Sequence, residues 1–209
     1  MKTVYFVRHG QSMTNAEEIR IPDAPLSDIG KEQAKRVSAS PHFKKCEVIL
    51  SSTKKRARET TEIINKELNL PVEYSELLIE RERPTFQYNK RKDDPACREA
   101  DRLFFDNFCE NNFHYEDEEN YSELKNRAEK ILEIIKKRPE NTILVVTHGF
   151  ILRILLSLMI HQEHITPKVC LDFLQQIPRT KNTGITIATF DGNWQVLTWN
   201  DYNHLLYGN

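Results

Sequence analysis

Two short apolar runs in this chain each end in a histidine followed by a glycine. Arg8-His9-Gly10 follows the run Thr3 to Val7, and Thr147-His148-Gly149 follows the run Thr142 to Val146. Unbroken β-prone runs of this length are typical of strands buried on both faces of a parallel sheet. Such a sheet needs helices on both sides, so the pattern restricts the chain to a layered α/β fold. Ligands of such folds bind beyond the carboxyl ends of the strands.

Helical and strand patterns alternate along the rest of the chain. Ser27 is placed to cap a helix that starts at Asp28, and a hairpin with an Asp191-Gly192-Asn193 turn closes the chain. The predicted helices cover about 28–39, 54–68, 122–138, 150–160 and 167–175, and further strands cover 46–50, 72–74, 185–190 and 194–199. These elements predict a three-layer α/β/α fold with a mainly parallel sheet, as one domain over residues 1–209.

Residues 81–120 differ in composition from the rest. Proline, arginine and aromatic residues interleave there, which predicts an inserted, partly helical, lid-like excursion. Its acidic run, Glu116 to Glu119, is interpreted as a solvated loop. Arg81 and Arg83, with Lys90, Arg91 and Lys92, are candidates for extra anion contacts from this lid. The alternative is a solvated face balanced by Asp93 and Asp94.

The charge balance excludes several classes of protein. The 209 residues carry 30 Lys+Arg and 31 Asp+Glu, a formal net charge of −1, which does not suit a general binder of nucleic acid or membrane surfaces. No run approaches the roughly 18 apolar residues of a membrane span. The four cysteines lie apart, without a C-x-x-C pair, so we expect reduced thiols in a cytoplasmic chain. Monomer and homodimer both remain open.

The polar groups at the predicted strand ends suit a phosphoryl group. They are Arg8, His9, Ser52, Arg56, His148 and Gly149. Two histidines and two arginines without a carboxylate make a poor metal site but a good anion pocket. A neutral imidazole can attack phosphorus, a second one can donate hydrogen bonds, and free N–H groups of a helix starting after Gly149 would add to the same field. We expect no metal and no cofactor.

The residues around these histidines resemble a known family. Arg8-His9-Gly10-Gln11-Ser12-Met13-Thr14-Asn15 is similar to the R-H-G-x-[ST]-x-x-N signature of the histidine phosphatase superfamily, in the branch that includes cofactor-dependent phosphoglycerate mutases. Five further blocks resemble that family in order: 25–34 (P-L-[ST]-x-x-G-x-x-Q-A), 51–60 (S-S-x-x-x-R-A-x-x-T), 78–80 at the place where the family carries its acid, 146–149 (V-x-H-G), and 200–205. Six ordered blocks are far more specific than R-H-G alone.

The resemblance implies a role for each matching residue. It makes His9 the nucleophile that becomes phosphohistidine, and Arg8, Arg56 and His148 the phosphate clamp, with Asn15 and the Gly149 backbone as helpers. It makes Glu80 the general acid and later the base, although Glu76 and Glu82 are alternatives. Ser12 remains open between a phosphate donor and a residue that stabilises its own turn.

The predicted function is that of a metal-independent phosphomonoesterase acting through phosphohistidine on a small phosphorylated metabolite or a phosphoprotein. One alternative is a 2,3-bisphosphoglycerate-dependent phosphoglycerate mutase. The opening R-H-G-Q-S fits that alternative, but Glu80-Arg81-Glu82-Arg83-Pro84 replaces the R-H-Y-G-type segment of the mutases, and the chain is shorter. The second alternative is a non-catalytic phosphate-binding module, although such a module would not need a nucleophile and an acid together.

Overall fold

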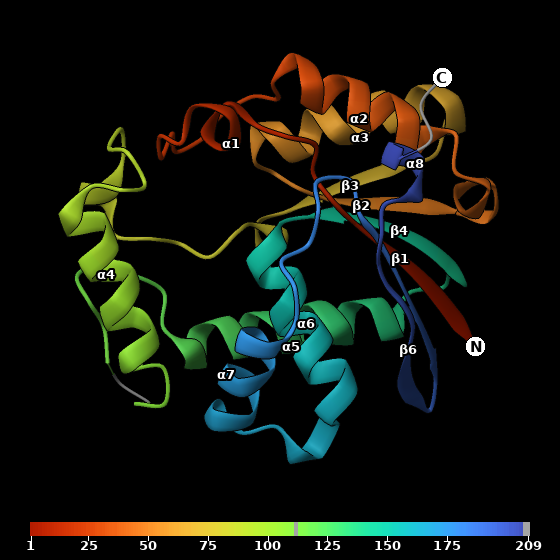
Figure 1. The fold of residues 1–209 in the computed structure, drawn as a ribbon. Coiled ribbons are helices and arrows are strands. Elements are labelled where there is room, and N and C mark those ends of the chain that lie inside the picture. The colour runs from red at the N-terminus through yellow and green to blue at the C-terminus, as the bar shows by residue number, and fades with distance from the viewer. Residues whose placement is uncertain (111–112, 207–209) are drawn as a thin grey trace.

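A six-stranded sheet forms the centre of the protein, seen in a computed structural model that describes residues 1–110 and 113–206. The strand order is β3-β2-β4-β1-β5-β6 (Figure 1). The strands are β1 Lys2–Arg8, β2 Val48–Ser52, β3 Val72–Ser75, β4 Thr142–Thr147, β5 Ile185–Asp191 and β6 Asn193–Asp201. The pairs β3–β2, β2–β4 and β4–β1 are parallel, and the pairs β1–β5 and β5–β6 are antiparallel, so β5 and β6 form an antiparallel edge. The predicted mainly parallel sheet is confirmed.

Helices cover both faces of this sheet. The α-helices are α1 Met13–Glu17, α2 Asp28–Ser38, α3 Lys55–Leu68, α4 Pro95–Asp106, α5 Tyr121–Lys137, α6 Gly149–His161, α7 Pro167–Gln176 and α8 Asn203–Leu206. Short 3₁₀ helices are η1 Pro41–Lys45, η2 Glu76–Leu78, η3 Thr85–Gln87 and η4 Gln162–His164. Figure 1 shows α2 and α3 on one side of the sheet and α5, α6 and α7 on the other. The predicted three-layer fold is therefore confirmed.

The alternation of side chains along β1 explains why it is apolar throughout. Val4 and Phe6 belong to the hydrophobic core shared with α5 and α6. Tyr5 and Val7 belong to the second core, formed with α2 and α3. Successive side chains of a strand point to opposite faces. A strand covered on both faces therefore needs apolar residues at every position, as β1 has.

Local signals set several element boundaries where they were predicted. The Ser27 side chain accepts a hydrogen bond from the Gly30 N–H at 3.1 Å, so it caps α2. Asn120 and Glu123 form a reciprocal capping box at the start of α5. Gly192 has φ of +79° between β5 and β6, a backbone conformation that favours glycine. The two helix starts follow from side chains that cap them, and the turn between β5 and β6 follows from a residue without a side chain.

The segment 81–120 carries η3 and α4 and lies at one end of the molecule (Figure 1). Its interpretation as ending in a solvated acidic loop is wrong for two residues. Glu118 is only 3% exposed and lies 3.2 Å from an Arg81 nitrogen. Glu119 pairs with Arg127 at 2.6 Å, and both side chains are nearly buried. Neither pair could be predicted from the sequence, because Arg81 lies far from Glu118 along the chain and Arg127 reaches Glu119 from the following helix α5.

The core shared by β1, α5 and α6 owes much of its size to α6, an almost wholly apolar helix of 13 residues. In the part of the chain that the structure describes, no helix is long and apolar enough to cross a membrane. The interior of α6 nevertheless contains Arg153, which is 9% exposed. A charged residue inside an apolar helix needs a reason, because burying an unpaired charge is costly.

Two glycines allow α2 to lie directly against the loop that follows β1. A Cβ atom on Gly30 would lie 2.0 Å from the Gln11 carbonyl oxygen, and one on Gly10 would lie 2.4 Å from the Gly30 oxygen. The loop is also bound to α2 because Gln33 accepts the Gln11 N–H at 2.8 Å, and the Ser27 N–H is donated to the Gln11 oxygen at 2.9 Å. The 25–34 block therefore holds the His9 loop in place.

We expect Gly30→Ala to lower the free energy of unfolding by about 1–3 kcal/mol, because the methyl group cannot be accommodated without moving backbone. Urea unfolding measures this loss. Ile29→Ala is the control, since that side chain is 60% exposed on the same turn and should change stability by less than about 0.5 kcal/mol. Equal stability of the two variants would show that the backbone contact is not tight.

Candidate active site

The two histidines lie side by side because their strands are neighbours in the sheet. Arg8 is the last residue of β1 and pairs in register with Thr147, the last residue of β4. The His9 N–H continues this ladder by donating to the Thr147 oxygen at 2.9 Å. The ring centroids of His9 and His148 are 4.9 Å apart. The structure thus brings together the two residues that the strand–His–Gly pattern singled out.

The contacts of His9 define which ring nitrogen carries its proton. Nδ1 lies 2.6 Å from the Gly10 carbonyl oxygen, which can only accept, so the proton is assigned to Nδ1. Nε2 keeps its lone pair and accepts a hydrogen bond from Arg56 Nε at 3.2 Å. The backbone is held as well, since Thr60 Oγ1 accepts the Gly10 N–H at 3.1 Å and Asn182 donates to the His9 oxygen at 3.0 Å.

His148 is fully buried behind His9, and it is held by β2. Its Nε2 lies 2.8 Å from Ser52 Oγ. Ser52 Oγ also accepts the Lys54 N–H at 3.3 Å, and it can donate to the His148 nitrogen or accept from it, so this contact fits either tautomer of His148. The remaining nitrogen, Nδ1, has no hydrogen-bond partner among the described residues. The tautomer with its proton on Nδ1 is the one that offers a ring N–H to a ligand.

Both histidines are neutral at physiological pH. Burial lowers the pKa of His9 well below 6.5, and the positive charges of Arg56 and Arg8 lower it further. Burial is also the main cause that lowers the pKa of His148, followed by Arg56, His9 and Arg8. An unprotonated imidazole is the form that can act as a nucleophile.

Arg8 and Arg56 reach this point from a strand end and a helix start. Arg8 donates through Nη1 to the Thr180 oxygen, and its Nε is buried without a partner in the described chain. Arg56 lies in the first turn of α3, which follows directly on the end of β2. Gly149 lies against the Arg8 side chain, because a Cβ there would be 3.3 Å from Arg8 Nε.

Ser12 and Asn15 bind each other next to the histidines. Ser12 N–H and Oγ–H both donate to Asn15 Oδ1, at 3.2 and 3.0 Å. Ser12 is the residue before α1, so this pair closes the first turn of that helix. Both residues line the cavity described below. The geometry supports the turn-stabilising role for Ser12, while phosphate contacts from either residue stay a prediction.

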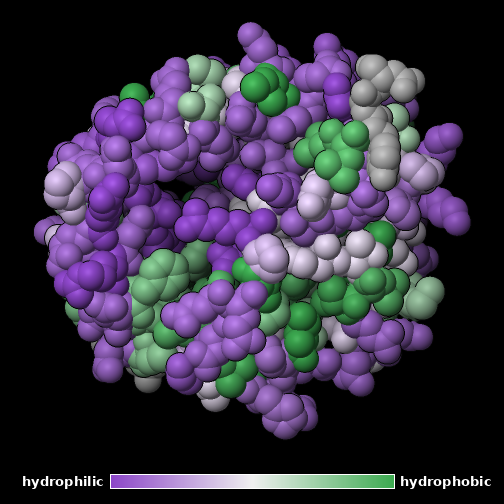
Figure 2. Space-filling view, viewed as in Figure 1, coloured by the Kyte–Doolittle hydropathy of each residue, from purple (hydrophilic) through white to green (hydrophobic). Residues whose placement is uncertain are grey.

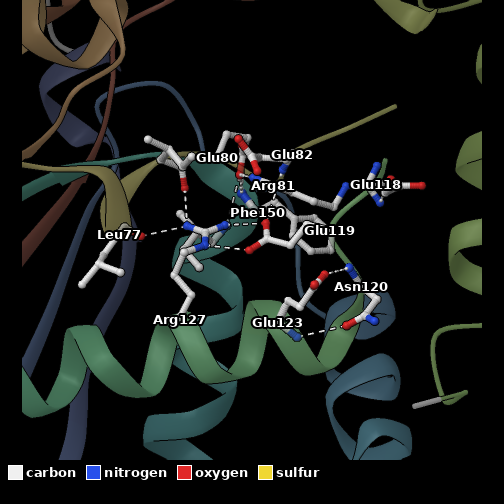
Figure 3. A network of polar contacts seen from close by, with 12 residues as sticks. Leu77, Glu80, Arg81, Glu82, Glu118, Glu119, Asn120, Glu123, Arg127 and Phe150 are labelled. Carbon is white, nitrogen blue, oxygen red and sulfur yellow. Dashed lines mark hydrogen bonds and ion pairs between the residues drawn. The ribbon is translucent and has the colours of Figure 1, made fainter. Parts of the chain in front are cut away.

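Several contacts from different elements fix the position of Glu80. Its carboxylate accepts hydrogen bonds from the N–H groups of Phe150 (3.0 and 3.1 Å) and Ile151 (3.1 Å). The preceding residues are pinned too, because Arg127 donates to the oxygens of Leu77 and Ile79 at 2.8 Å (Figure 3). The N–H groups of α6 that we expected to be free for phosphate are thus partly occupied by Glu80, which corrects that expectation.

The alternative acids Glu76 and Glu82 have different surroundings. Glu76 begins η2 and does not line the cavity, and its side chain is exposed. Glu82 is exposed at the cavity wall. Only Glu80 among these three carboxylates combines partial burial, a fixed position and a place in the cavity lining. The geometry therefore favours Glu80.

Arg8, His9, Ser12, Asn15, Arg56, Glu80 and Gly149 line one cavity of about 500 Å³, whereas His148 is fully buried and does not line it. Figure 2 shows the molecule hollowed on this face, with hydrophilic residues around the opening. The charged residues of its lining are Arg8, Glu18, Arg20, Lys54, Arg56, Glu80, Arg81, Glu82, Arg83, Lys92, Asp101, Arg153 and Arg179. Nine of these are cationic and four are anionic, so the cavity is positive although the whole chain is nearly neutral.

Arg81 and Arg83 line the cavity, but their charges are already partnered. Asp101 on α4 contacts Arg81 at 3.1 Å and Arg20 at 2.6 Å, and also pairs with Arg83. Burial alone would raise the pKa of Asp101, yet the guanidinium groups outweigh it and lower that pKa. The Arg81 guanidinium also stacks 3.8 Å from the centre of the Phe104 ring.

The alternative interpretation, that these cations form a solvated face, is therefore wrong for Arg81, whose side chain is 1% exposed. It holds for Arg91, which pairs with Asp93 at 2.9 Å on the surface. Lys92 pairs with Glu18 at 3.0 Å. Anion contacts from Arg81 and Arg83 stay a prediction, because each would compete with Asp101.

The cavity also contains residues that the sequence analysis did not select. Arg153, Arg179 and Thr180 form part of its lining. A single arginine within the apolar sequence of α6 is the signal that would have pointed to Arg153. Arg179 and Thr180 lie in the connection between α7 and β5 and carry no such signal. The described residues include no group of three His, Cys, Asp or Glu that could hold a metal ion.

The buried neutral histidines give the protein a characteristic pH dependence. Unfolded histidine takes up a proton near pH 6.5, whereas the folded pKa of His148 lies well below that. Below pH 6.5 the unfolded state therefore binds more protons, and stability falls as the pH drops toward 5. Above pH 6.5 His148 is largely neutral in both the folded and the unfolded state, so it no longer lowers the free energy of unfolding.

We expect His148→Gln to reduce the slope of unfolding free energy against pH between pH 6 and 5 by about 1 kcal/mol per pH unit. Urea unfolding at several pH values measures it. His164→Gln is the control, because that side chain is 85% exposed. Parallel slopes for wild type and His148→Gln would contradict the buried neutral state.

Comparison with known proteins agrees with this geometry. The family model of the histidine phosphatase superfamily (branch 1) matches residues 4–202. The uncharacterized phosphatase PhoE of Bacillus subtilis is 28% identical over 160 residues, which cover 75% of this chain and 77% of PhoE. The solved structure of Bacillus stearothermophilus YhfR is 28% identical and has a TM-score of 0.81, covering 98% of this chain and 100% of that one.

A solved structure from Entamoeba histolytica, described as a phosphoserine phosphatase in complex with 3-phosphoglyceric acid, is 19% identical with a TM-score of 0.76. It covers 98% of this chain and 100% of that one, and shows likeness of fold. The family match begins within β1, runs past the end of β6 and includes every candidate site residue. The chain therefore belongs to the histidine phosphatase superfamily (branch 1) and is a phosphatase.

Proposed function

We propose that this phosphatase hydrolyses phosphomonoesters without a metal, through a phosphohistidine on His9. The observation that carries the proposal is the state of His9, which is buried and neutral and has its Nε2 lone pair beside the Arg56 guanidinium. A nucleophile of this kind needs no metal to activate it. The positive cavity wall supplies the electrostatic stabilisation that a transferring phosphoryl group requires.

In the first step, His9 Nε2 attacks phosphorus and forms the N–P bond while the ester P–O bond breaks. Arg56 moves its hydrogen bond from Nε2 to a phosphoryl oxygen, and Arg8 and the His148 Nδ1–H bind the other oxygens. Glu80 delivers a proton to the departing oxygen, so that an alcohol leaves rather than an alkoxide. The Gly10 carbonyl accepts from Nδ1 throughout and orients the ring.

In the second step, water attacks phosphorus, Glu80 takes its proton, and the N–P bond breaks to release phosphate and neutral His9. Glu80 begins the second step as a carboxylate, because it gave its proton in the first. Its fixed position at the start of α6 keeps it near the reacting oxygens in both steps. The cycle therefore consumes one ester and one water and returns the enzyme unchanged.

The cavity supports a small phosphorylated metabolite as the substrate class. A volume of about 500 Å³ matches a compact ligand. The segment 81–120 forms part of the wall through Tyr88 and Phe105, and we propose that it acts as the lid of one domain. The cytoplasm remains our proposed location, and either a monomer or a homodimer fits the proposal.

His9→Ala should abolish turnover of p-nitrophenyl phosphate, measured with excess chelator from acid to neutral pH. Acid-labile phosphate should be trapped on the wild-type chain and not on the variant, because only His9 forms the N–P bond. His164→Ala, at an exposed histidine, is the matched control for trapping. Full activity in His9→Ala would overturn the proposal. Conversion of 3-phosphoglycerate into 2-phosphoglycerate after priming with 2,3-bisphosphoglycerate would replace it by the mutase.

Glu80→Gln should lower kcat for an alkyl phosphate by about 10²–10⁴-fold, the usual range for losing a positioned acid. A smaller loss is expected for phosphorylation of the enzyme by p-nitrophenyl phosphate, because nitrophenolate leaves without a proton. Burst kinetics with both substrates measure the difference, and Glu82→Gln is the control at an exposed carboxylate of the same wall. An equal loss with both substrates would remove Glu80 from the acid role.

A further inference from the structure

One wall of the cavity carries buried polar atoms that the phosphoryl chemistry does not use. They belong to Arg153 and Thr180, with Arg179 beside them at the surface. Thr180 is 2% exposed, and its Oγ1 has no hydrogen-bond partner in the described part of the chain. A buried hydroxyl without a partner costs free energy unless a ligand or water satisfies it.

Gly149 locates this wall relative to the catalytic groups. A Cβ atom on Gly149 would lie 3.3 Å from Thr180 Oγ1 and 3.3 Å from Arg8 Nε. The two unpartnered atoms therefore flank one glycine at the start of α6. The lack of a side chain at Gly149 lets both buried atoms lie directly behind the backbone of this glycine, which itself lines the cavity.

Arg153 is the second unusual group on this wall. Its Nη2 donates to the Leu174 oxygen in the last turns of α7, while its Nε is buried without a partner in the described chain. No carboxylate of the described residues pairs with Arg153, although Arg20, Arg81 and Arg83 all pair with Asp101. The carbonyl contact orients the guanidinium but does not neutralise it.

Arg179 adds a further positive charge to the same wall. Its side chain is exposed, and no carboxylate among the described residues forms an ion pair with it. Burial lowers the pKa of Arg153 and the charge of Arg179 lowers it further, while the Glu80 carboxylate acts in the opposite direction without reversing the shift. Burial likewise lowers the pKa of Arg8 against the opposing effect of Glu80, and Arg56 and Arg179 add to the lowering. The cations are thus close enough to repel one another, and an anion between them would relieve this repulsion.

We propose that Arg153, Arg179 and Thr180 form a second anion subsite, so that the preferred substrates are phosphomonoesters that carry another anionic group near the transferred phosphoryl group. This inference rests on the proposed function of the same cavity. One phosphoryl group accounts for Arg8 and Arg56 but leaves Arg153 and Arg179 without an anion. The ligand chemistry is a carboxylate or a second phosphate, each of which accepts several hydrogen bonds from guanidinium groups.

Binding to matched ligand pairs tests the subsite apart from catalysis. The His9→Ala background prevents turnover, and titration calorimetry compares 3-phosphoglycerate with glycerol 3-phosphate, which has a hydroxymethyl group in place of the carboxylate. A second pair, fructose 1,6-bisphosphate and fructose 6-phosphate, tests a phosphate as the added anion. We expect at least one pair to show about ten-fold preference for the ligand with the extra anion.

Arg179→Gln in that background should reduce this preference to about two-fold or less, and its exposed position keeps the fold intact. Arg153→Lys should reduce it as well, since lysine keeps the charge but cannot make both the Leu174 contact and the ligand contact. Lys92→Gln is the matched control, because it removes a cation from the same cavity but one that Glu18 already neutralises. It should leave the preference unchanged.

No preference in either pair, or equal preference in Arg179→Gln and its background, would overturn the subsite. These outcomes are distinct from failure of the proposed function, which would appear as absent hydrolysis by the wild-type chain while the binding preference persists. Turnover by the wild-type chain completes the test, because kcat/KM should be about ten-fold higher for the preferred member of the pair.

Discussion

The parallel pairing of β1 with β4 is the constraint on which the rest of the site depends. Their register places Arg8 beside Thr147, and the hydrogen bond from His9 N–H to the Thr147 oxygen carries that pairing one residue past the strand. A shift of one residue would turn every side chain of β1 to the opposite face. Both hydrophobic cores use β1, so burial on both faces fixes this register. The separation of the two histidines is therefore a product of core packing.

Burial decides the chemical state of the catalytic groups once the register is fixed. The two imidazoles are neutral because they are removed from water beside two guanidinium groups. The same low exposure strengthens the field that a phosphoryl group would experience. Among the described residues, five cations of the cavity form no ion pair with a carboxylate: Arg8, Lys54, Arg56, Arg153 and Arg179. A nearly neutral chain thus supports a positive cavity, because the lining gathers nine cations and only four anions.

The sequence predicted the parts of the structure that depend on local patterns. The layered fold, the helix cap at Ser27 and the neighbouring strand ends all follow from periodicity and short motifs. The contacts of Glu118 and Arg81 could not be predicted, because they join positions far apart in the chain. A run of four acidic residues looks solvated unless the buried arginine opposite it is known. Likewise, nothing local to Thr180 shows that its hydroxyl faces the same cavity as Arg8.

Some residues of the family motifs serve the backbone rather than the ligand. Gly10 and Gly30 allow two segments to touch, and Gln33 and Thr60 bind the loop that carries His9. The family motifs therefore contain residues that hold the backbone in place as well as residues proposed to take part in the reaction. The sequence alone does not separate these uses, because a glycine needed for close packing and one needed beside a phosphate look the same.

The position of Glu80 at the start of α6 has a consequence for how this fold can change. The carboxylate satisfies N–H groups that begin the central helix of one core, so the proposed acid is also the cap of that helix. A descendant chain that no longer needed catalysis could replace His9 more easily than Glu80. Retention of this glutamate in a related sequence would then indicate an intact helix, and the histidine would be the better marker of an active enzyme.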